Sequence, residues 1–177
     1  MSSKSILFTA IVFTALLAAG ASRAEEAQKP NPLDTVPEKM PFDIPYGAPI
    51  TLERAQGVIA AALAEAGKHD WKMNIAVVDS GGNLVAFQRM DGAQLGSIQI
   101  SEHKARAAVE FRRETKAFEN AIQLNNMPYV ATLDGVIGSR GGKPLVEGGK
   151  IVGAVGCSGG TGSQDEVTCK AGVASFK

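Results

Sequence analysis

The spacing of apolar residues predicts helices and strands in the first half of the chain. Apolar positions recur at helical intervals over 52–67, directly after Thr51, a favourable N-cap residue. Consecutive apolar residues over 75–78 predict a strand over 74–79 that is covered on both faces. The polar turn 80–83 then returns the chain into a second strand over 84–90. A helix followed by a β-hairpin is therefore expected.

In the second half of the chain, the predicted helices and strands follow one another in a different order. Helices are predicted over 97–113 and 115–124, and a last helix over 164–175. Between them, the run 145–155 is interrupted by Gly148-Gly149, which is typical of a two-residue hairpin turn. Because both strand pairs are hairpins, the sequence predicts an α+β fold with a largely antiparallel sheet flanked by helices.

Two N-terminal segments lie outside this pattern. Residues 1–24 combine Lys4, an apolar run and small residues before Ala24, which is typical of a secretory signal peptide. The apolar run is short for a membrane span, so we expect cleavage after Ala24, with a retained anchor as the alternative. Residues 25–49 contain six prolines and should form an extended arm. The remainder, 50–177, is long enough for one domain, and the mature chain is expected to be periplasmic or secreted.

Charge argues against one class of partner. The full chain carries 18 basic and 18 acidic residues. Loss of residues 1–24 removes Lys4 and Arg23 and no acidic residue, so 16 basic and 18 acidic residues remain. Nucleic-acid binding depends on clustered positive charge. A slightly acidic mature chain therefore predicts no nucleic-acid partner.

The chain has two cysteines, Cys157 and Cys169. An even number of cysteines in an oxidising compartment favours a disulfide. Two buried free thiols, or a metal or redox role, are the alternatives. The spacing is not Cys-x-x-Cys, which weakens the redox alternative.

A glycine loop around Gly159 and Gly160 separates the last strand from the last helix. It has neither the lysine of a phosphate-binding P-loop nor the third glycine of a dinucleotide fingerprint. Ser163 to Glu166 fits a capping box, and Asp165 suits the positive end of the helix. The loop is therefore either a capped tight turn or one wall of a pocket for an uncharged or metal-bearing ligand.

Several short blocks, taken in order over about residues 50–177, carry a family resemblance. The blocks are Thr51–Ala55, Ile75–Gly82, Leu84–Gly92, Lys104-Ala105 with Ala107-Ala108, Phe111 and Thr115, Gly141–Pro144, and Gly153–Gly156 with Ser158–Glu166. This set resembles the haem-binding or haem-degrading family that contains GlcG-type proteins, HbpS and the C-terminal domain of the propanediol-utilisation cobalamin adenosyltransferase. The resemblance implies a profilin-like sandwich that forms homo-oligomers with pockets near subunit contacts. It also implies haem as a suspected cofactor.

Haem needs an axial ligand, for which histidine is a common choice. His69 lies in a polar connection and is interpreted as a solvated loop residue. His103 lies on the polar face of a helix, where it is either a solvated residue or the axial ligand at an oligomer cleft. Thr115 falls on the family's threonine. It is either the N-cap of the third helix or a pocket hydroxyl that contacts the iron.

Three cations are candidates for binding a haem propionate or another carboxylate. Lys104 has apolar neighbours one turn away in each direction, so its ammonium either extends along them to the surface or points into a pocket. Arg112 and Arg89 are further propionate candidates, although either could be an ordinary surface charge. No metal is expected apart from haem iron at His103 or Thr115.

The function predicted from these residues is extracytoplasmic haem binding for storage, sensing or protection, with haem degradation as a further option. One alternative is a binder or enzyme for a small organic acid or aromatic metabolite, using Lys104 and the Gly159-Gly160 loop. Another is a structural oligomer module without a ligand. No catalytic set can be recognised, since Ser158 lacks the Gly-x-Ser-x-Gly context of hydrolases.

Overall fold

The computed structural model describes residue 31 and residues 34–176, so the predicted signal peptide lies outside the described residues. The chain divides into two units between Lys39 and Met40, and of the first unit the structure describes only residue 31 and residues 34–39. In the first unit, the Asp34 N–H donates to the Asn31 carbonyl at 3.0 Å. No helix in the described part of the chain is long and apolar enough to span a membrane.

Every α-helix and β-strand in the described part of the chain lies in the second unit. In chain order they are α1 (Leu52–Lys68), β1 (Asn74–Asp79), β2 (Leu84–Arg89), α2 (Gly96–Glu110), α3 (Lys116–Gln123), the 3₁₀ helix η2 (Pro128–Thr132), β3 (Gly142–Glu147), β4 (Lys150–Ser158) and α4 (Gly162–Ser175). This order matches the sequence prediction. The one addition is η2, in the segment expected to be a loop.

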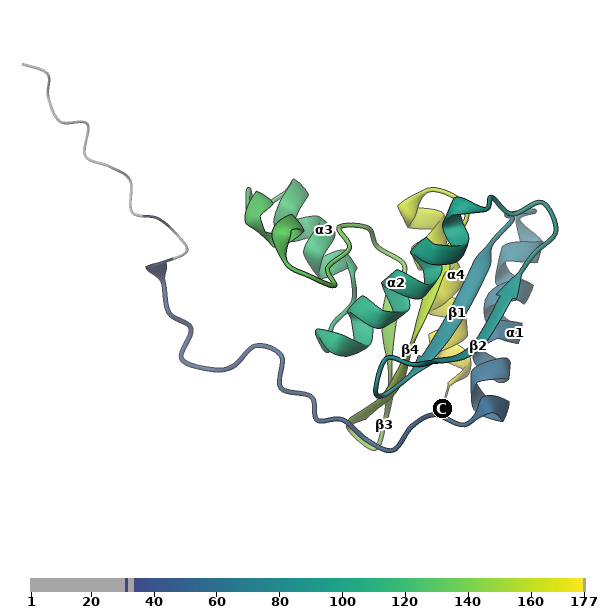
Figure 1. The fold of residues 1–177 in the computed structure, drawn as a ribbon, viewed down its shortest axis with the longest axis horizontal. Helices are drawn as coiled ribbons and strands as arrows, with labels where there is room; N and C mark the ends of the chain where they lie inside the picture. Colours follow the sequence, from purple (N-terminus) through teal and green to yellow (C-terminus); the bar gives the residue numbers. More distant parts are fainter. Residues whose placement is uncertain (1–30, 32–33, 177) are drawn as a thin grey trace, which may run out of the picture. The chain divides into compact units, whose positions relative to one another are not determined.

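The four strands form one antiparallel sheet in the order β2-β1-β4-β3. Figure 1 shows α2 on one face of this sheet and α1 with α4 on the other. The predicted α+β class with an antiparallel sheet and flanking helices is therefore confirmed. Both hairpins also form where the turns were expected, and Gly148 and Gly149 take positive φ angles of 54° and 75°.

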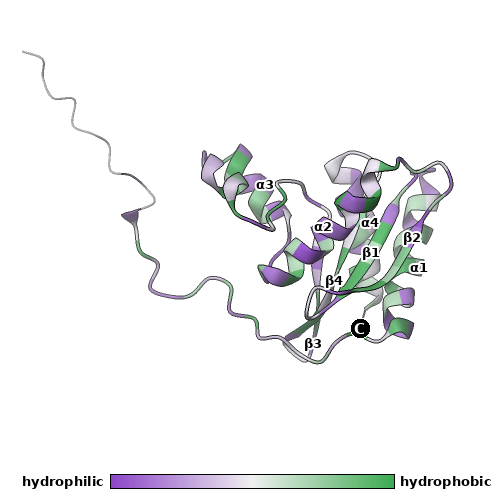
Figure 2. Cartoon of the chain, in the orientation of Figure 1, coloured by the Kyte–Doolittle hydropathy of each residue, from purple (hydrophilic) through white to green (hydrophobic). Residues whose placement is uncertain are grey.

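Alternate residues of β1 supply two separate cores. Ile75 and Val77 pack with residues of α1 and α4, whereas Ala76 and Val78 pack against α2. Figure 2 shows the resulting apolar character along β1 and β4. The strand is buried on both faces, as its continuous apolar run predicted.

One glycine sets the distance between α2 and the sheet. A Cβ atom at Gly156 of β4 would lie 2.0 Å from the Ser101 carbonyl oxygen and 2.6 Å from the Ala105 nitrogen. Only a residue without a side chain fits between strand and helix at this point. This contact places α2 directly on the middle of the sheet, with Lys104 facing it.

Three sequence predictions about helix ends need correction. α2 ends at Glu110 rather than 113, because Arg112 adopts a positive φ of 54° that no α-helix accommodates. Thr115 lies at the N-cap position of α3 but its hydroxyl makes no capping bond. In α4 the capping box is formed by Thr161 and Gln164, two residues before the predicted Ser163–Glu166 pair.

Candidate functional site

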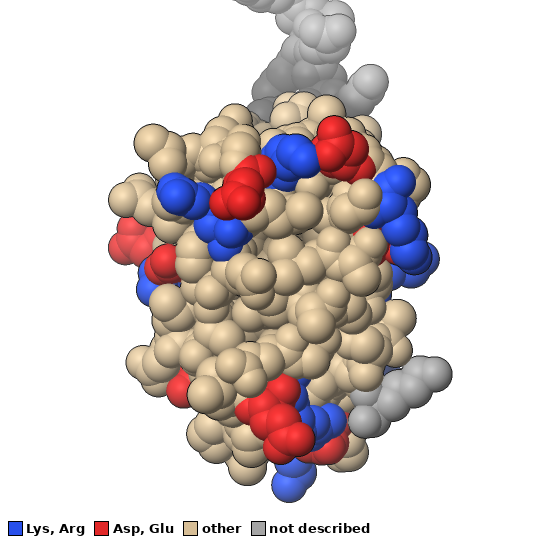
Figure 3. Space-filling view, turned by 90° about the vertical axis from the view of Figure 1, so that its right-hand side faces the viewer, with Lys and Arg blue, Asp and Glu red and all other residues tan. Residues whose placement is uncertain are grey.

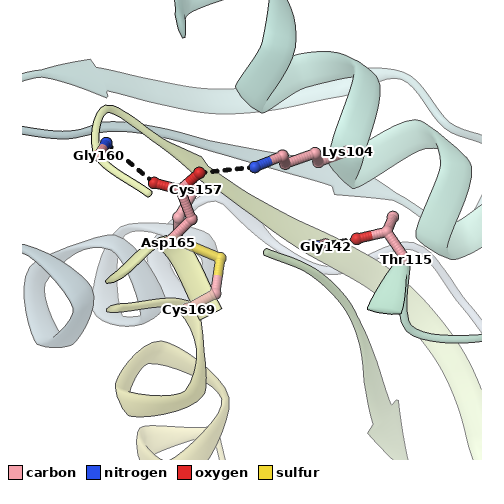
Figure 4. Close-up of a disulfide and its surroundings, with 7 residues drawn as sticks. All are labelled: Lys104, Thr115, Gly142, Cys157, Gly160, Asp165 and Cys169. Atoms are coloured by element: carbon pink, nitrogen blue, oxygen red, sulfur yellow. Dashed lines mark hydrogen bonds and ion pairs between the residues drawn. A yellow bond between two sulfur atoms is a disulfide. The ribbon is translucent and has the colours of Figure 1, made fainter. Parts of the chain in front are cut away.

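The most enclosed charges in the domain are a lysine and an aspartate. Lys104 of α2 donates from Nζ to Asp165 Oδ2 at 2.7 Å, and the two side chains are 1% and 4% exposed. The other carboxylate oxygen, Oδ1, accepts the N–H of Gly160 at 3.1 Å. Figure 4 shows Asp165 between the lysine and the glycine loop. The loop donor that could face an anion is therefore already bonded to the chain's own carboxylate.

The environment of Asp165 affects its protonation. Burial raises the pKa of the Asp165 carboxyl, and the Lys104 ammonium and the Gly160 N–H oppose this shift only in part. A small organic acid could reach Lys104 only by displacing Asp165. The geometry thus supports the interpretation of the loop as a capped turn, and a carboxylate-binding role for Lys104 stays a prediction.

Thr115 lies close to this pair but has its own partner. It is 0% exposed. Its Oγ1 accepts the N–H of Gly142 at 2.9 Å, and its N–H donates to the Gly142 carbonyl at 3.0 Å. A Cβ at Gly142 would lie 2.6 Å from Thr115 Cγ2, so there is no free space on this side. The hydroxyl therefore links the start of α3 to β3, and an iron contact would require this bond to open.

The two cysteines form a disulfide in the structure, with Cα atoms 5.6 Å apart. Of the alternatives left open by the sequence, this excludes two free thiols. Both residues are fully buried. The bridge joins the end of β4 to α4, and Asp165 and the glycine loop lie inside the ring that it closes (Figure 4).

His103 faces away from the Lys104 pair. Consecutive helical residues point about 100° apart, so Lys104 faces the sheet while the half-buried His103 faces the α3 side of α2. Its Nε2 lies 3.2 Å from the carbonyl oxygen of Gly135. One turn later on α2, Ala107 packs with Phe118 and Val130 in a small apolar cluster. The imidazole thus lies between the helix and the segment that follows η2.

The other histidine has a different environment. His69 stacks on Trp71 with ring centroids 4.3 Å apart, and its Nε2 lies 3.4 Å from Glu65 Oε1. Its side chain is 45% exposed. This agrees with the interpretation of His69 as a surface residue in a polar connection.

The two predicted propionate arginines are not brought together with Lys104. Arg112 follows the end of α2, with its guanidinium carbon 5.9 Å from the centre of the Tyr46 ring. Arg89 is exposed at the end of the edge strand β2, in the same cross-strand row as Asn74 and Ser158. It therefore lies at the glycine-loop end of the sheet but two strands away from that loop.

A charged cluster next to Thr115 was not found from the sequence. Glu166 of α4 accepts from Lys116 Nζ at 3.1 Å and from Arg140 Nη1 at 3.2 Å, and Lys143 Nζ lies 3.8 Å away. Burial opposes ionisation of Glu166, but these three cations lower its pKa. The four residues of this cluster come from α3, β3, α4 and a loop. No spacing in the sequence therefore indicates that they meet.

Glu119 belongs to the same cluster. Arg140 donates to it from Nε at 2.7 Å and from its backbone N–H at 2.8 Å. The side-chain hydrogen bond from Arg140 lowers the pKa of Glu119, with burial opposing it. Among the described residues, no group of three or more His, Cys, Asp or Glu side chains could hold a metal ion. The cluster is thus a set of ion pairs rather than a metal centre.

Comparison with known proteins gives one family. Residues 50–174 match the family described as haem degrading protein HbpS-like. Protein GlcG of Escherichia coli strain K12 is 42% identical over 109 residues, which cover 62% of this chain and 81% of GlcG.

Solved structures give the same fold. A double mutant of Streptomyces reticuli HbpS is 28% identical, with a TM-score of 0.68 over 81% of this chain and 98% of HbpS. The PduOC:heme complex is 22% identical, with a TM-score of 0.67 over 73% of this chain and 96% of that chain. At that identity the second likeness shows the fold alone.

Proposed function

The chain belongs to the HbpS-like family of haem-degrading proteins, and from this premise we propose that it is an extracytoplasmic protein that binds haem. Storage, sensing or protection would each need reversible, stoichiometric binding. The observation that supports the proposal most strongly is the family match over 50–174, which runs from just before α1 almost to the end of α4. A haem complex among the proteins of the same fold agrees with it.

The residues around His103 fit the chemical needs of haem. An imidazole is a common axial ligand of haem iron, and His103 is the histidine that borders an apolar cluster. Ile100 lies three residues earlier on the same side of α2 and is 38% exposed. Leu133, two residues before Gly135, is 46% exposed. These side chains offer apolar surface on which a porphyrin face could pack.

A cation for a propionate lies on the same side of the helix. Arg106 follows His103 by three residues and is exposed, with Nη2 3.2 Å from Glu102 Oε2. This surface ion pair is weak and can exchange for a propionate at little cost. Bound haem would supply an iron centre, while the chain supplies the ligand, the apolar contact and this charge.

The location outside the cytoplasm rests on two features. Residues 1–24 have the pattern of a secretory signal peptide. The disulfide between Cys157 and Cys169 is of a kind that persists in oxidising compartments. Expression of the full chain in a secreting host should give a mature protein that begins at Glu25, as measured by intact mass. A protein that keeps Met1 to Ala24 would contradict this part of the proposal.

Haem binding is tested by titration. Adding ferric haem to the purified chain should shift the Soret band and saturate at a fixed ratio of haem to protein. The same titration of His69→Ala should saturate similarly, because His69 stacks on Trp71 at the surface. A Soret band that stays identical to that of free haem at every ratio would refute the proposal.

A further inference from the structure

A hollow lies where the first half of α1 meets the end of α4. Its volume is about 180 Å³, and it is lined by Arg54, Gly57, Val58, Ser175 and Phe176. Pockets for drug-sized ligands measure about 300–1,000 Å³. The hollow is therefore too small for a whole porphyrin and suits only a small molecule.

A glycine in the second turn of α1 keeps the hollow open. Glycine in a helix interior destabilises the helix by about 1 kcal/mol relative to alanine, and Gly57 lies in such a position. A Cβ at Gly57 would meet no atom within 4 Å, so close packing does not require a glycine here. Gly172 of α4 differs, because a Cβ there would lie 3.0 Å from the Val58 carbonyl oxygen. Helix packing thus accounts for Gly172, whereas the space beside Gly57 is free for a ligand.

The guanidinium of Arg54 borders the hollow and is held in place from one side. Its carbon lies 4.0 Å from the centre of the Phe176 ring, and its Nη1 donates to Glu147 Oε1 at 2.6 Å. A guanidinium has five N–H donors, and among the described residues Arg54 uses its side chain in this one hydrogen bond. The Arg54 side chain is 30% exposed. Its other N–H groups can therefore bind a molecule from solution.

Arg54 also lies next to an uncharged surface. Within α1, no residue between Arg54 and Glu65 carries a charge. Figure 3, which faces the side of the molecule with α1, shows charged residues near the top and bottom of the face and none in its centre. The partner of Arg54, Glu147, has a side chain that is 55% exposed, so this ion pair is a weak surface contact. A carboxylate from solution can therefore replace Glu147 as the partner of Arg54.

From these features we infer that the hollow binds a small monocarboxylate with a short apolar body. The carboxylate accepts two N–H bonds from Arg54, in the bidentate geometry that a guanidinium favours. The apolar body enters the space beside Gly57 and contacts Val58 and Phe176. A carboxylate without this body gains only the ion pair, and a neutral molecule of the same shape gains only the apolar contact.

Benzoate is a suitable probe, and the amide NMR spectrum of the isotope-labelled protein shows where it binds. Benzoate should shift the amide signals of Gly57, Val58 and Phe176 until the shifts saturate. Gly57→Leu fills the space and Arg54→Gln removes the charge, so each should weaken benzoate binding about tenfold or more. Gly67→Leu makes the first change near the other end of α1, where an added Cβ also meets no atom within 4 Å, and should leave the binding unchanged. Circular dichroism checks that each variant is folded.

Two further comparisons separate a binding site from an ordinary surface charge. Glu147→Gln removes the carboxylate that competes for Arg54 and should strengthen benzoate binding. Benzamide and acetate each lack one half of the ligand, and each should bind about tenfold or more weakly than benzoate. The inference would be overturned by the absence of a saturable shift, by benzamide binding as tight as benzoate binding, or by a Gly57→Leu variant that binds benzoate like the wild type. No haem is present in these titrations, so their outcome is independent of the proposed function.

Discussion

Lys104 and Asp165, 61 residues apart in the sequence, form an ion pair that is almost completely enclosed, with Nζ 2.7 Å from Oδ2. Removing one member of a buried pair leaves the other charge without a partner, which costs about 3–5 kcal/mol. Lys104→Met should therefore lower the free energy of unfolding by about this amount. The change can be measured by urea unfolding, followed through the fluorescence of Trp71, the single tryptophan.

The control for this pair is a double variant. Asp165→Asn keeps an oxygen that can accept the Gly160 N–H but removes the charge. Adding it to Lys104→Met should recover part of the lost stability. A double variant that is less stable than Lys104→Met alone would show that the two charges are not the source of the effect.

Reduction of the disulfide should loosen the glycine-loop end of the domain. The bridge spans a sequence separation of 12, and closing a loop of this size stabilises a fold by about 3 kcal/mol. Urea unfolding in the presence of reductant should show a loss of this order. Because the two cysteines are bonded to each other and fully buried, a thiol reagent should label them only after the chain has been both unfolded and reduced. A variant with alanine at both positions should not respond to reductant.

Substitutions at Thr115 can distinguish a structural role of its hydroxyl from a role as a ligand of haem iron. Thr115→Val keeps the shape of the side chain but leaves the Gly142 N–H without its acceptor, at a cost of about 1–3 kcal/mol. Thr115→Ser keeps the acceptor and should retain more of the stability. The Soret band of the haem-bound protein should stay in the same position in both variants. A shifted band in a folded Thr115→Val protein would favour the iron contact instead.

Haem affinity should depend on one histidine and not on the other. His103→Ala should weaken haem binding about tenfold or more, since it removes the proposed axial ligand. His69→Ala is the matched control, because His69 stacks on Trp71 at the surface. Equal effects of the two substitutions in a haem titration would remove His103 from the site.

Acid should destabilise the cluster around Arg140. The side-chain hydrogen bond from Arg140 lowers the pKa of Glu119 in the folded protein below the ordinary value of 4.5. The unfolded chain then binds the proton more tightly, so the contribution of Glu119 is complete above its unfolded pKa and is lost as pH falls through its folded pKa. Glu119→Gln should therefore show a smaller loss of stability as pH falls from neutral to below 4.5, the ordinary value for a glutamate. Arg140→Gln, which removes the partner of both Glu119 and Glu166, should give at least as large a reduction in urea unfolding.

Local pattern was enough to predict the elements but not their ends. The period of apolar residues located the helices and strands, and Gly148-Gly149 located a hairpin. The α4 cap was misplaced because Thr161 to Gln164 and Ser163 to Glu166 both fit the capping-box pattern. The earlier start puts Asp165 in the first turn, where its carboxylate reaches the Gly160 N–H.

Contacts between distant segments were beyond the reach of the sequence. Lys104, Thr115 and Asp165 were each selected as candidates, but their partners depend on how α2, α3 and α4 pack around β3 and β4. Thr115 bonds to Gly142, 27 residues later, and Arg140 bonds to Glu119 and Glu166 from two other elements. Such pairings follow from tertiary packing, and no periodicity encodes them.

The carboxylate of Asp165 also acts as a tethered competitor. It is held against the Gly160 N–H by the first turn of α4 and by the ring that the disulfide closes. An anion from solution would compete with a group whose effective concentration at this position is set by covalent connection, which a free ligand at ordinary concentration rarely matches. The Asp165 side chain therefore keeps phosphates and carboxylates away from the Gly160 N–H. A neutral group at the surface of the loop meets no such competition.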